Sequence, residues 1–181
     1  GYGGHVRHVP APDAYRPLDG EGGAAFAAAF AAKVEAAIAS LAESPFGFSA
    51  LIIDPFFANE GFPDLPSGFL DRTVSAVRKA GGLVIADEVQ PGFTRTGDAF
   101  WGFGRQGIVP DLVTSGKPMA NGLPTSMMAA RHEVLEPFAG SIPYFNTFGG
   151  NPVCMAAAQA VLDVLRDEDT MSHAKQVGAI F

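Results

Sequence analysis

Two residues in the middle of the chain, Asp87 and Lys117, have side chains that could together handle an aldehyde-bearing cofactor. A lysine amine forms a Schiff base with an aldehyde, and it can shuttle a proton when partial burial or nearby positive charge lowers its pKa. A carboxylate beside a pyridine nitrogen keeps that nitrogen protonated, so that the ring accepts electrons. The same residues are also compatible with a turn cap and a solvated surface lysine. Chemistry alone leaves both interpretations open.

The elements around these residues predict that they lie at one edge of a sheet. Three short apolar segments, typical of buried strands, each end at a polar group: Ser49–Ile53 before Asp54, Leu83–Ala86 before Asp87, and Leu112–Thr114 before Ser115-Gly116-Lys117. A fourth covers Thr125–Ala130, and apolar spacing predicts helices over about 23–42, 69–80 and 152–167. This alternation indicates an α/β fold with a three-layer, mainly parallel sheet flanked by helices, in which ligands gather at the carboxyl ends of the strands.

The bulk composition limits the class of protein. The 181 residues suffice for one domain, and no internal repeat or low-complexity linker divides them. Hydrophobic residues make up 48% and charged residues 17%, which suggests apolar surface that another segment or subunit covers. The net charge of −7 argues against a nucleic-acid partner, and the lack of a run of about 18 apolar residues argues against a membrane span. The single cysteine, Cys154, cannot form an internal disulfide, which favours the cytoplasm.

Three motifs set Asp87 and Lys117 in a known pattern. Asp87-Glu88-Val89-Gln90, followed by GFTRTG at 92–97, resembles the signature of the class III aminotransferases. The segment SGKPMANG at 115–122 is similar to the one that carries the family's Schiff-base lysine, and NTFGGNP at 146–152 is similar to its third motif. All three follow in the family's order and at about its spacing. The resemblance implies the large domain of a pyridoxal-phosphate-dependent, fold-type-I transferase.

The resemblance also implies a role for each matching residue. Asp87 would pair with the pyridinium nitrogen of pyridoxal 5′-phosphate, Val89 would pack on its ring, and Gln90 would reach its phenolic oxygen. Lys117 would hold the cofactor as a Schiff base and move the substrate proton, which makes it the catalytic residue. Thr147 would bind the cofactor phosphate across the interface of a homodimer with a shared active site, although its hydroxyl could instead bond only its own turn. No metal site is expected.

The sequence departs from the family pattern at named positions. Thr94 stands where the family usually has glycine, and Gly116 and Pro118 flank the lysine in place of the more frequent alanine and glycine. The flanking variant resembles the branch of alanine–glyoxylate type transaminases and ethanolamine-phosphate phospho-lyases. The family's N-terminal phosphate cradle and C-terminal small domain have no counterpart here. We therefore expect residues 1–181 to be one partial domain, the central part of the large domain, and to be inactive alone.

These matches predict an aminotransferase that moves an amino group from an amine or amino acid to a 2-oxo acid. Two alternatives stay open: a pyridoxal-phosphate-dependent phospho-lyase acting on a phosphorylated amino alcohol, and a truncated, non-catalytic module. The presence of Asp87, Gln90, Lys117 and Thr147 argues against the module, because a relic has no chemical reason to keep all four.

Overall fold

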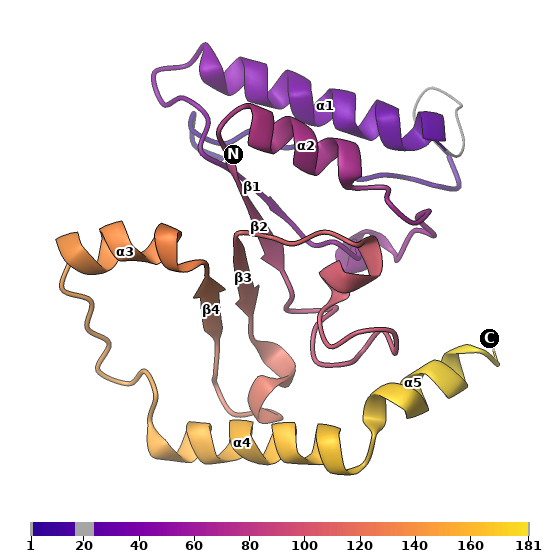
Figure 1. The fold of residues 1–181 in the computed structure, drawn as a ribbon, viewed down its shortest axis with the longest axis vertical. Coiled ribbons are helices and arrows are strands. Elements are labelled where there is room, and N and C mark those ends of the chain that lie inside the picture. The colour runs from indigo at the N-terminus through magenta and orange to yellow at the C-terminus, as the bar shows by residue number, and fades with distance from the viewer. Residues whose placement is uncertain (1, 17–23, 181) are drawn as a thin grey trace.

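Four short strands form one mixed sheet in the computed structural model, which describes residues 2–16 and 24–180 (Figure 1). In spatial order the strands are β1 (Ala50–Ile53), β2 (Leu83–Asp87), β3 (Leu112–Ser115) and β4 (Met127–Ala130). β1, β2 and β3 are parallel, whereas β4 runs antiparallel to β3. The predicted α/β fold with a mainly parallel sheet is confirmed, with the fourth strand beginning two residues later than expected.

Within residues 2–16 and 24–180, five α-helices and three short 3₁₀ turns connect and cover these strands. The α-helices are α1 (Ala24–Ala42), α2 (Asp71–Lys79), α3 (His132–Ser141), α4 (Pro152–Asp167) and α5 (Thr170–Gly178). The 3₁₀ turns are η2 (Ala58–Glu60), η3 (Gly102–Gln106) and η4 (Lys117–Ala120). The three predicted helices are confirmed as α1, α2 and α4, although Gly23 lies outside the described residues. No bounds were predicted from the sequence for α3 or α5, and neither helix buries any of its residues.

The hydrophobic core lies between the α1–α2 pair and one face of the sheet. Phe26, Phe30 and Val34 from α1 meet Phe69 and the buried faces of α2 and the strands. The Phe69 ring lies 5.1 Å from Phe26 and 5.3 Å from Phe30, centroid to centroid, within the range of favourable aromatic pairs. By length and composition alone, Ala25–Ala42 would also be apolar enough to cross a membrane, with a mean hydropathy of 1.5. Its aromatic face is instead buried in this core.

The two faces of the sheet differ in how they are covered. Val84 and Ala86 of β2 have no exposed surface, because they face the α1–α2 layer. Their neighbours Ile85 and Asp87 point to the opposite face, where Ile52 of β1 is 64% exposed. Figure 1 shows α4 running past the end of the sheet at which β2 and β3 finish, beside η4. Asp87 therefore lies on the more open face, at the edge that α4 borders.

Candidate active site

The carboxyl ends of three parallel strands bring together the polar residues that the sequence singled out. Asp54 directly follows β1, Asp87 ends β2, and Lys117 follows Ser115, the last residue of β3, by two positions. Asp87 is the register partner of Thr114, so the last residues of β2 and β3 lie side by side. The predicted meeting of these groups at one edge of the sheet is confirmed. Their chemical roles stay predictions.

Asp54 is fully engaged in holding its own loop. Its Oδ1 accepts a hydrogen bond from the Phe56 N–H at 2.8 Å, and its Oδ2 accepts one from the Ala58 N–H at 2.9 Å. Aspartate commonly stabilises a turn in this way. The turn contains Phe57 in a left-handed conformation, with φ of 50°. Asp54 thus has a structural function that accounts for both of its oxygens.

Asp87 keeps one carboxylate oxygen for another partner. Its Oδ1 accepts a hydrogen bond from the Val89 N–H at 3.0 Å, whereas Oδ2 bonds to no group in the described part of the chain. The side chain is half-buried, and so are Val89 and Gln90 after it. The Asp87 carboxylate is therefore anchored through one oxygen and can accept a proton donor at the other.

Lys117 begins the η4 turn with an unusual backbone conformation. Its φ is 34°, in the left-handed region that residues other than glycine rarely adopt. Its side chain is exposed. Such conformations cluster at functional sites, where the surrounding fold maintains them. Here the support comes from α4, which packs against η4 and begins at an Asn151 cap whose Oδ1 accepts the Cys154 N–H at 3.0 Å. Gly116, directly before the lysine, is buried.

Glu88, to which the sequence assigned no role, is the most deeply buried acid of this edge. Its side chain has no exposed surface, and its two oxygens accept the backbone N–H groups of Gly102 at 2.6 Å and Phe103 at 2.8 Å. Burial raises the pKa of Glu88 from 4.5 to about 7, against the lowering effect of these two donors. The negative charges of Asp54 and Asp87 raise it further. Adjacency to Asp87 was the only signal in the sequence, because a pattern of residue types does not reveal which acid is buried.

Thr147 lies in a turn in which every residue from 142 to 150 is exposed. Asn146, not Thr147, organises this turn, because its Oδ1 accepts the N–H groups of Phe148 at 3.2 Å and Gly149 at 2.9 Å. Among the residues that the structure describes, the Thr147 hydroxyl has no hydrogen-bond partner. The structure does not bring Thr147 into contact with Asp87 or Lys117 in the same chain.

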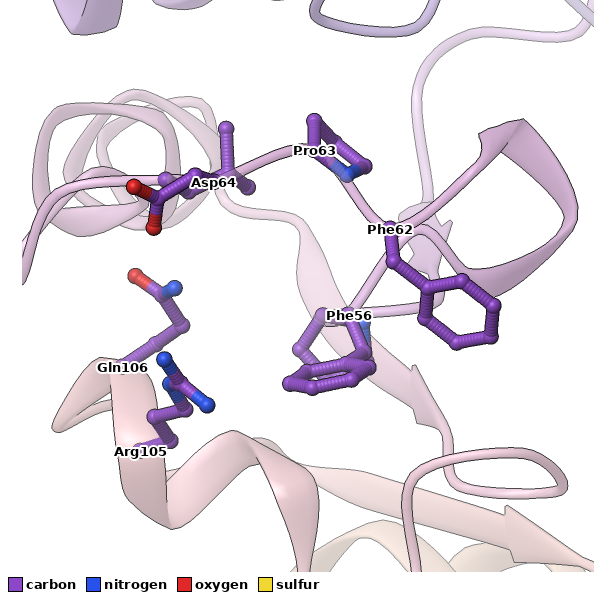
Figure 2. Close-up of a pocket in the computed structure, with 8 residues that line it drawn as sticks. Phe56, Phe62, Pro63, Asp64, Arg105 and Gln106 are labelled. Carbon is purple, nitrogen blue, oxygen red and sulfur yellow. The ribbon is translucent and has the colours of Figure 1, made fainter. Parts of the chain in front are cut away.

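A cavity of about 210 Å³ lies between the loop after β1 and η3. Figure 2 shows Arg105 and Gln106 rising from η3 toward the loop that carries Phe56 and Asp64. The Arg105 guanidinium lies 5.5 Å from the centroid of the Phe56 ring, and it also faces Asp98 at 3.8 Å. Neither Asp87 nor Lys117 lines this cavity, which is formed where the Asp54 loop packs on η3.

Comparison with known proteins assigns the chain to a family. The model of the aminotransferase class-III family matches residues 3–181. The chain belongs to the class-III aminotransferase family. Human mitochondrial alanine–glyoxylate aminotransferase 2, one member, is 40% identical over 139 residues, which are 77% of this chain and 26% of that protein. Ethanolamine-phosphate phospho-lyase homolog 1 of Caenorhabditis elegans is 44% identical over 115 residues, 62% of this chain and 25% of that protein.

Solved structures of a phospholyase and of an aminotransferase have the same fold as this chain. An Arthrobacter phospholyase in complex with phosphoethanolamine superposes with a TM-score of 0.88 and 43% identity, over 98% of this chain and 42% of that one. An aminotransferase from Bacillus anthracis gives a TM-score of 0.83 and 30% identity, over 96% of this chain and 39% of that one. The chain thus spans about a quarter of the length of the curated relatives it matches. The relatives of this chain thus include both an aminotransferase and a phospho-lyase homolog.

The donor set at this edge fits pyridoxal phosphate, the cofactor that class-III membership implies. The free Oδ2 of Asp87 is a partner of the right charge for a pyridinium nitrogen, and the exposed Lys117 amine is the group that an aldehyde requires. The half-buried Gln90 amide can donate a hydrogen bond to an oxygen anion. The phosphate is the part for which the described residues offer least, since Thr147 is exposed and stands apart from the others.

Proposed function

We propose that the full-length protein is a pyridoxal-phosphate-dependent aminotransferase, which moves an amino group from an amine or amino acid to a 2-oxo acid. The observation that carries the proposal is the meeting of Asp87 and Lys117 at the carboxyl ends of β2 and β3 in a class-III chain. Bound pyridoxal phosphate supplies an electron sink for a substrate carbanion. A carboxylate with one free oxygen and an amine at the same edge are the two groups that this chemistry requires from the protein.

Each of four candidate site residues then has a defined role. Asp87, held by the Val89 N–H, keeps the cofactor's ring nitrogen protonated with its other oxygen. The exposed Lys117 amine would hold the cofactor and would move the proton to and from the substrate's α-carbon. Val89 would pack on the cofactor ring, and Gln90 would donate a hydrogen bond to its phenolic oxygen. The class-III family supports these roles by resemblance, and the geometry of the strand ends is compatible with them.

A homodimer is part of the same proposal. The turn that holds Thr147 is exposed, and its hydroxyl is available to the phosphate of a neighbouring subunit. Large apolar side chains around it are exposed as well, including Tyr144 at 73% and Phe145 at 83%. Exposed aromatic groups of this kind mark a surface that another chain or segment covers. We also propose a reducing compartment such as the cytoplasm, since the one cysteine is unpaired and buried.

A phospho-lyase that acts on a phosphorylated amino alcohol is the second candidate, because the phospholyase structure from Arthrobacter matches this chain at 43% identity. Both reactions need the same proton removal, and they differ in whether a phosphate leaves from the β-carbon. Expelling phosphate needs a cluster of cations. The basic residues of the loop after β2 are Arg95, which is exposed, and Arg105, which faces Asp98 and Phe56. These two arginines do not form a cationic cluster for a phosphate group, which favours transamination.

The reaction is tested with the full-length protein loaded with pyridoxal phosphate. It is incubated with amino donors and, separately, with phosphoethanolamine, each with and without a 2-oxo acid. We expect turnover only when the 2-oxo acid is present. Ammonia and phosphate released from phosphoethanolamine without any oxo acid would instead establish the lyase. Failure of both reactions, with no covalently bound cofactor, would refute the proposed function.

A further inference from the structure

Glu88, the residue after Asp87, makes its side-chain hydrogen bonds to the η3 turn. Its carboxyl group is fully buried and accepts the N–H groups of Gly102 and Phe103, which lie 14 and 15 residues later in the sequence. A buried carboxyl group is tolerated when each of its oxygens has a hydrogen-bond partner. The Glu88 side chain therefore anchors η3 to the end of β2.

The backbone of the same residue binds the end of β3. The Glu88 N–H donates to the Thr114 carbonyl at 2.8 Å, and the buried Ser115 hydroxyl donates to the Glu88 carbonyl at 3.3 Å. Lys117 follows Ser115 by two residues, and Asp87 directly precedes Glu88. One residue thus connects three segments, namely the ends of β2 and β3 and the η3 turn, between the two groups proposed for catalysis.

The loop packs too closely around Glu88 to move independently of it. A Cβ atom added at Gly102 would lie 2.3 Å from the Pro91 Cβ and 3.4 Å from Glu88 Oε2. One added at Gly92 would lie 2.7 Å from the Glu88 carbonyl oxygen and 3.0 Å from the Trp101 ring. Neither contact could be relieved without shifting backbone. A displaced Glu88 would consequently displace the loop that follows Asp87 and contains Gln90.

We propose that Glu88 is the positioning residue of this site: by holding the η3 turn and the ends of β2 and β3 together, it fixes where Asp87 and Lys117 lie relative to one another. Glu88 does not touch the cofactor in this proposal and acts only through its neighbours. The inference rests on the proposed function, because it concerns residues whose roles are assigned there. It predicts that changing Glu88 alters both the η3 turn and the environment of the bound cofactor.

The test compares Glu88→Gln with the wild-type full-length protein loaded with pyridoxal phosphate. Glutamine keeps the size of glutamate, but its amide nitrogen would face one of the two N–H donors, so that one hydrogen bond is lost. We expect amide hydrogen exchange across residues 100–106 to accelerate by about tenfold or more. We further expect the apparent pKa read from the cofactor's visible absorption band to shift by about half a unit or more. Glu43→Gln, an exposed acid after α1, is the matched control and should change neither measurement.

Each result bears on a different part of the proposal. Unchanged exchange in Glu88→Gln would overturn the anchoring of η3. Faster exchange with an unchanged absorption pKa would show that Glu88 is only structural, which would also overturn the proposal. If Glu88→Gln does not fold, Glu88→Asp replaces it; this variant keeps the carboxyl group but is too short to reach both donors, and the same two shifts are expected. A wild-type protein without lysine-bound cofactor would refute the proposed function and the positioning role, whereas exchange would still report on the anchor.

Discussion

The ends of β1 and β2 are alike in sequence and different in structure. Each strand ends in or just before an aspartate, and each aspartate accepts the N–H of the residue two positions later: Phe56 for Asp54 and Val89 for Asp87. Asp54 adds a second bond to the Ala58 N–H, so both of its oxygens are engaged. Asp87 has no such second bond within the described residues. The loop after β1 uses its acid to build a turn, whereas the loop after β2 leaves half of its acid free.

The two loops differ in which residue holds them in place through hydrogen bonds. After β1, the aspartate itself closes the loop. After β2, Glu88 closes the loop instead of the aspartate, because its carboxyl group binds the N–H groups of Gly102 and Phe103. Asp87 can therefore interact with a ligand while the loop stays in place. A pair of adjacent acids, one structural and one free, is the physical basis for treating the end of β2 as the reactive side.

The largest effect is expected at Lys117, which tests whether this reactive side is correctly identified. Lys117→Met in the full-length protein should lower turnover by about 10³-fold or more, because the amine both attaches the cofactor and transfers the proton. Borohydride reduction followed by peptide mapping should place the pyridoxyl group on Lys117. Lys79→Met, at the exposed end of α2, is the control and should keep full activity. A label on Lys33, Lys79 or Lys175 would contradict the assignment.

The two aspartates give the direct test of the comparison. Asp87→Asn should reduce turnover by about two to three orders of magnitude, because a neutral amide cannot hold a ring nitrogen in its charged form. Asp54→Asn should instead lower the free energy of unfolding by about 1–3 kcal/mol, because one backbone N–H loses its acceptor, while the folded enzyme stays active. Urea unfolding and steady-state rates separate the two effects. Asp54→Asn as inactive as Asp87→Asn, at unchanged stability, would remove the contrast.

Titration of Glu88 should make the stability of the protein depend on pH. Its pKa rises from 4.5 to about 7 on folding, chiefly because of burial, so the folded protein retains a proton that the unfolded chain releases. This stabilisation is fully present below pH 4.5 and is lost as the pH rises through about 7. It amounts to about 3 kcal/mol. Glu88→Gln cannot titrate, so the wild type should lose more stability than this variant between pH 5 and 8. Parallel pH profiles from urea midpoints would show that Glu88 does not titrate there.

The sequence predicted the backbone frame of the site well and its side-chain chemistry less completely. Apolar runs that end at Asp54, Asp87 and Ser115 revealed the strand ends, because buried parallel strands are uniformly apolar and stop where polar residues begin. Three features of the structure could not be predicted from the sequence, each for a physical reason. Asp54 and Asp87 are indistinguishable by type, and only hydrogen bonds reveal which oxygen is free. The anchoring by Glu88 depends on Gly102, which is distant in sequence. α3 carries Pro137 within it, which helix interiors disfavour, so its bounds could not be predicted from the sequence.

The smallest effect concerns Thr94, the residue that stands where the family usually has glycine. Its φ is 63°, which a β-branched residue adopts only at a cost of about 1 kcal/mol or more. Two contacts hold it: its N–H donates to the Phe100 carbonyl at 3.1 Å, and its hydroxyl lies 3.3 Å from that of Thr170 in α5. The loop after β2 thus contains strain that a tertiary contact offsets.

Two variants at this position separate strain from contact. Thr94→Gly removes the strain but also the hydroxyl pair, and it adds freedom to the unfolded chain, so the terms nearly cancel and stability should change by less than about 1 kcal/mol. Thr94→Val keeps the β-branched strain and loses only the hydroxyl, so it should destabilise by about 1 kcal/mol. Thermal unfolding of the full-length variants measures both. The glycine variant should be the more stable of the two, because only the valine variant keeps the strain. The opposite order would mean that the left-handed turn costs threonine little, and that the departure from glycine leaves the loop after β2 unstrained.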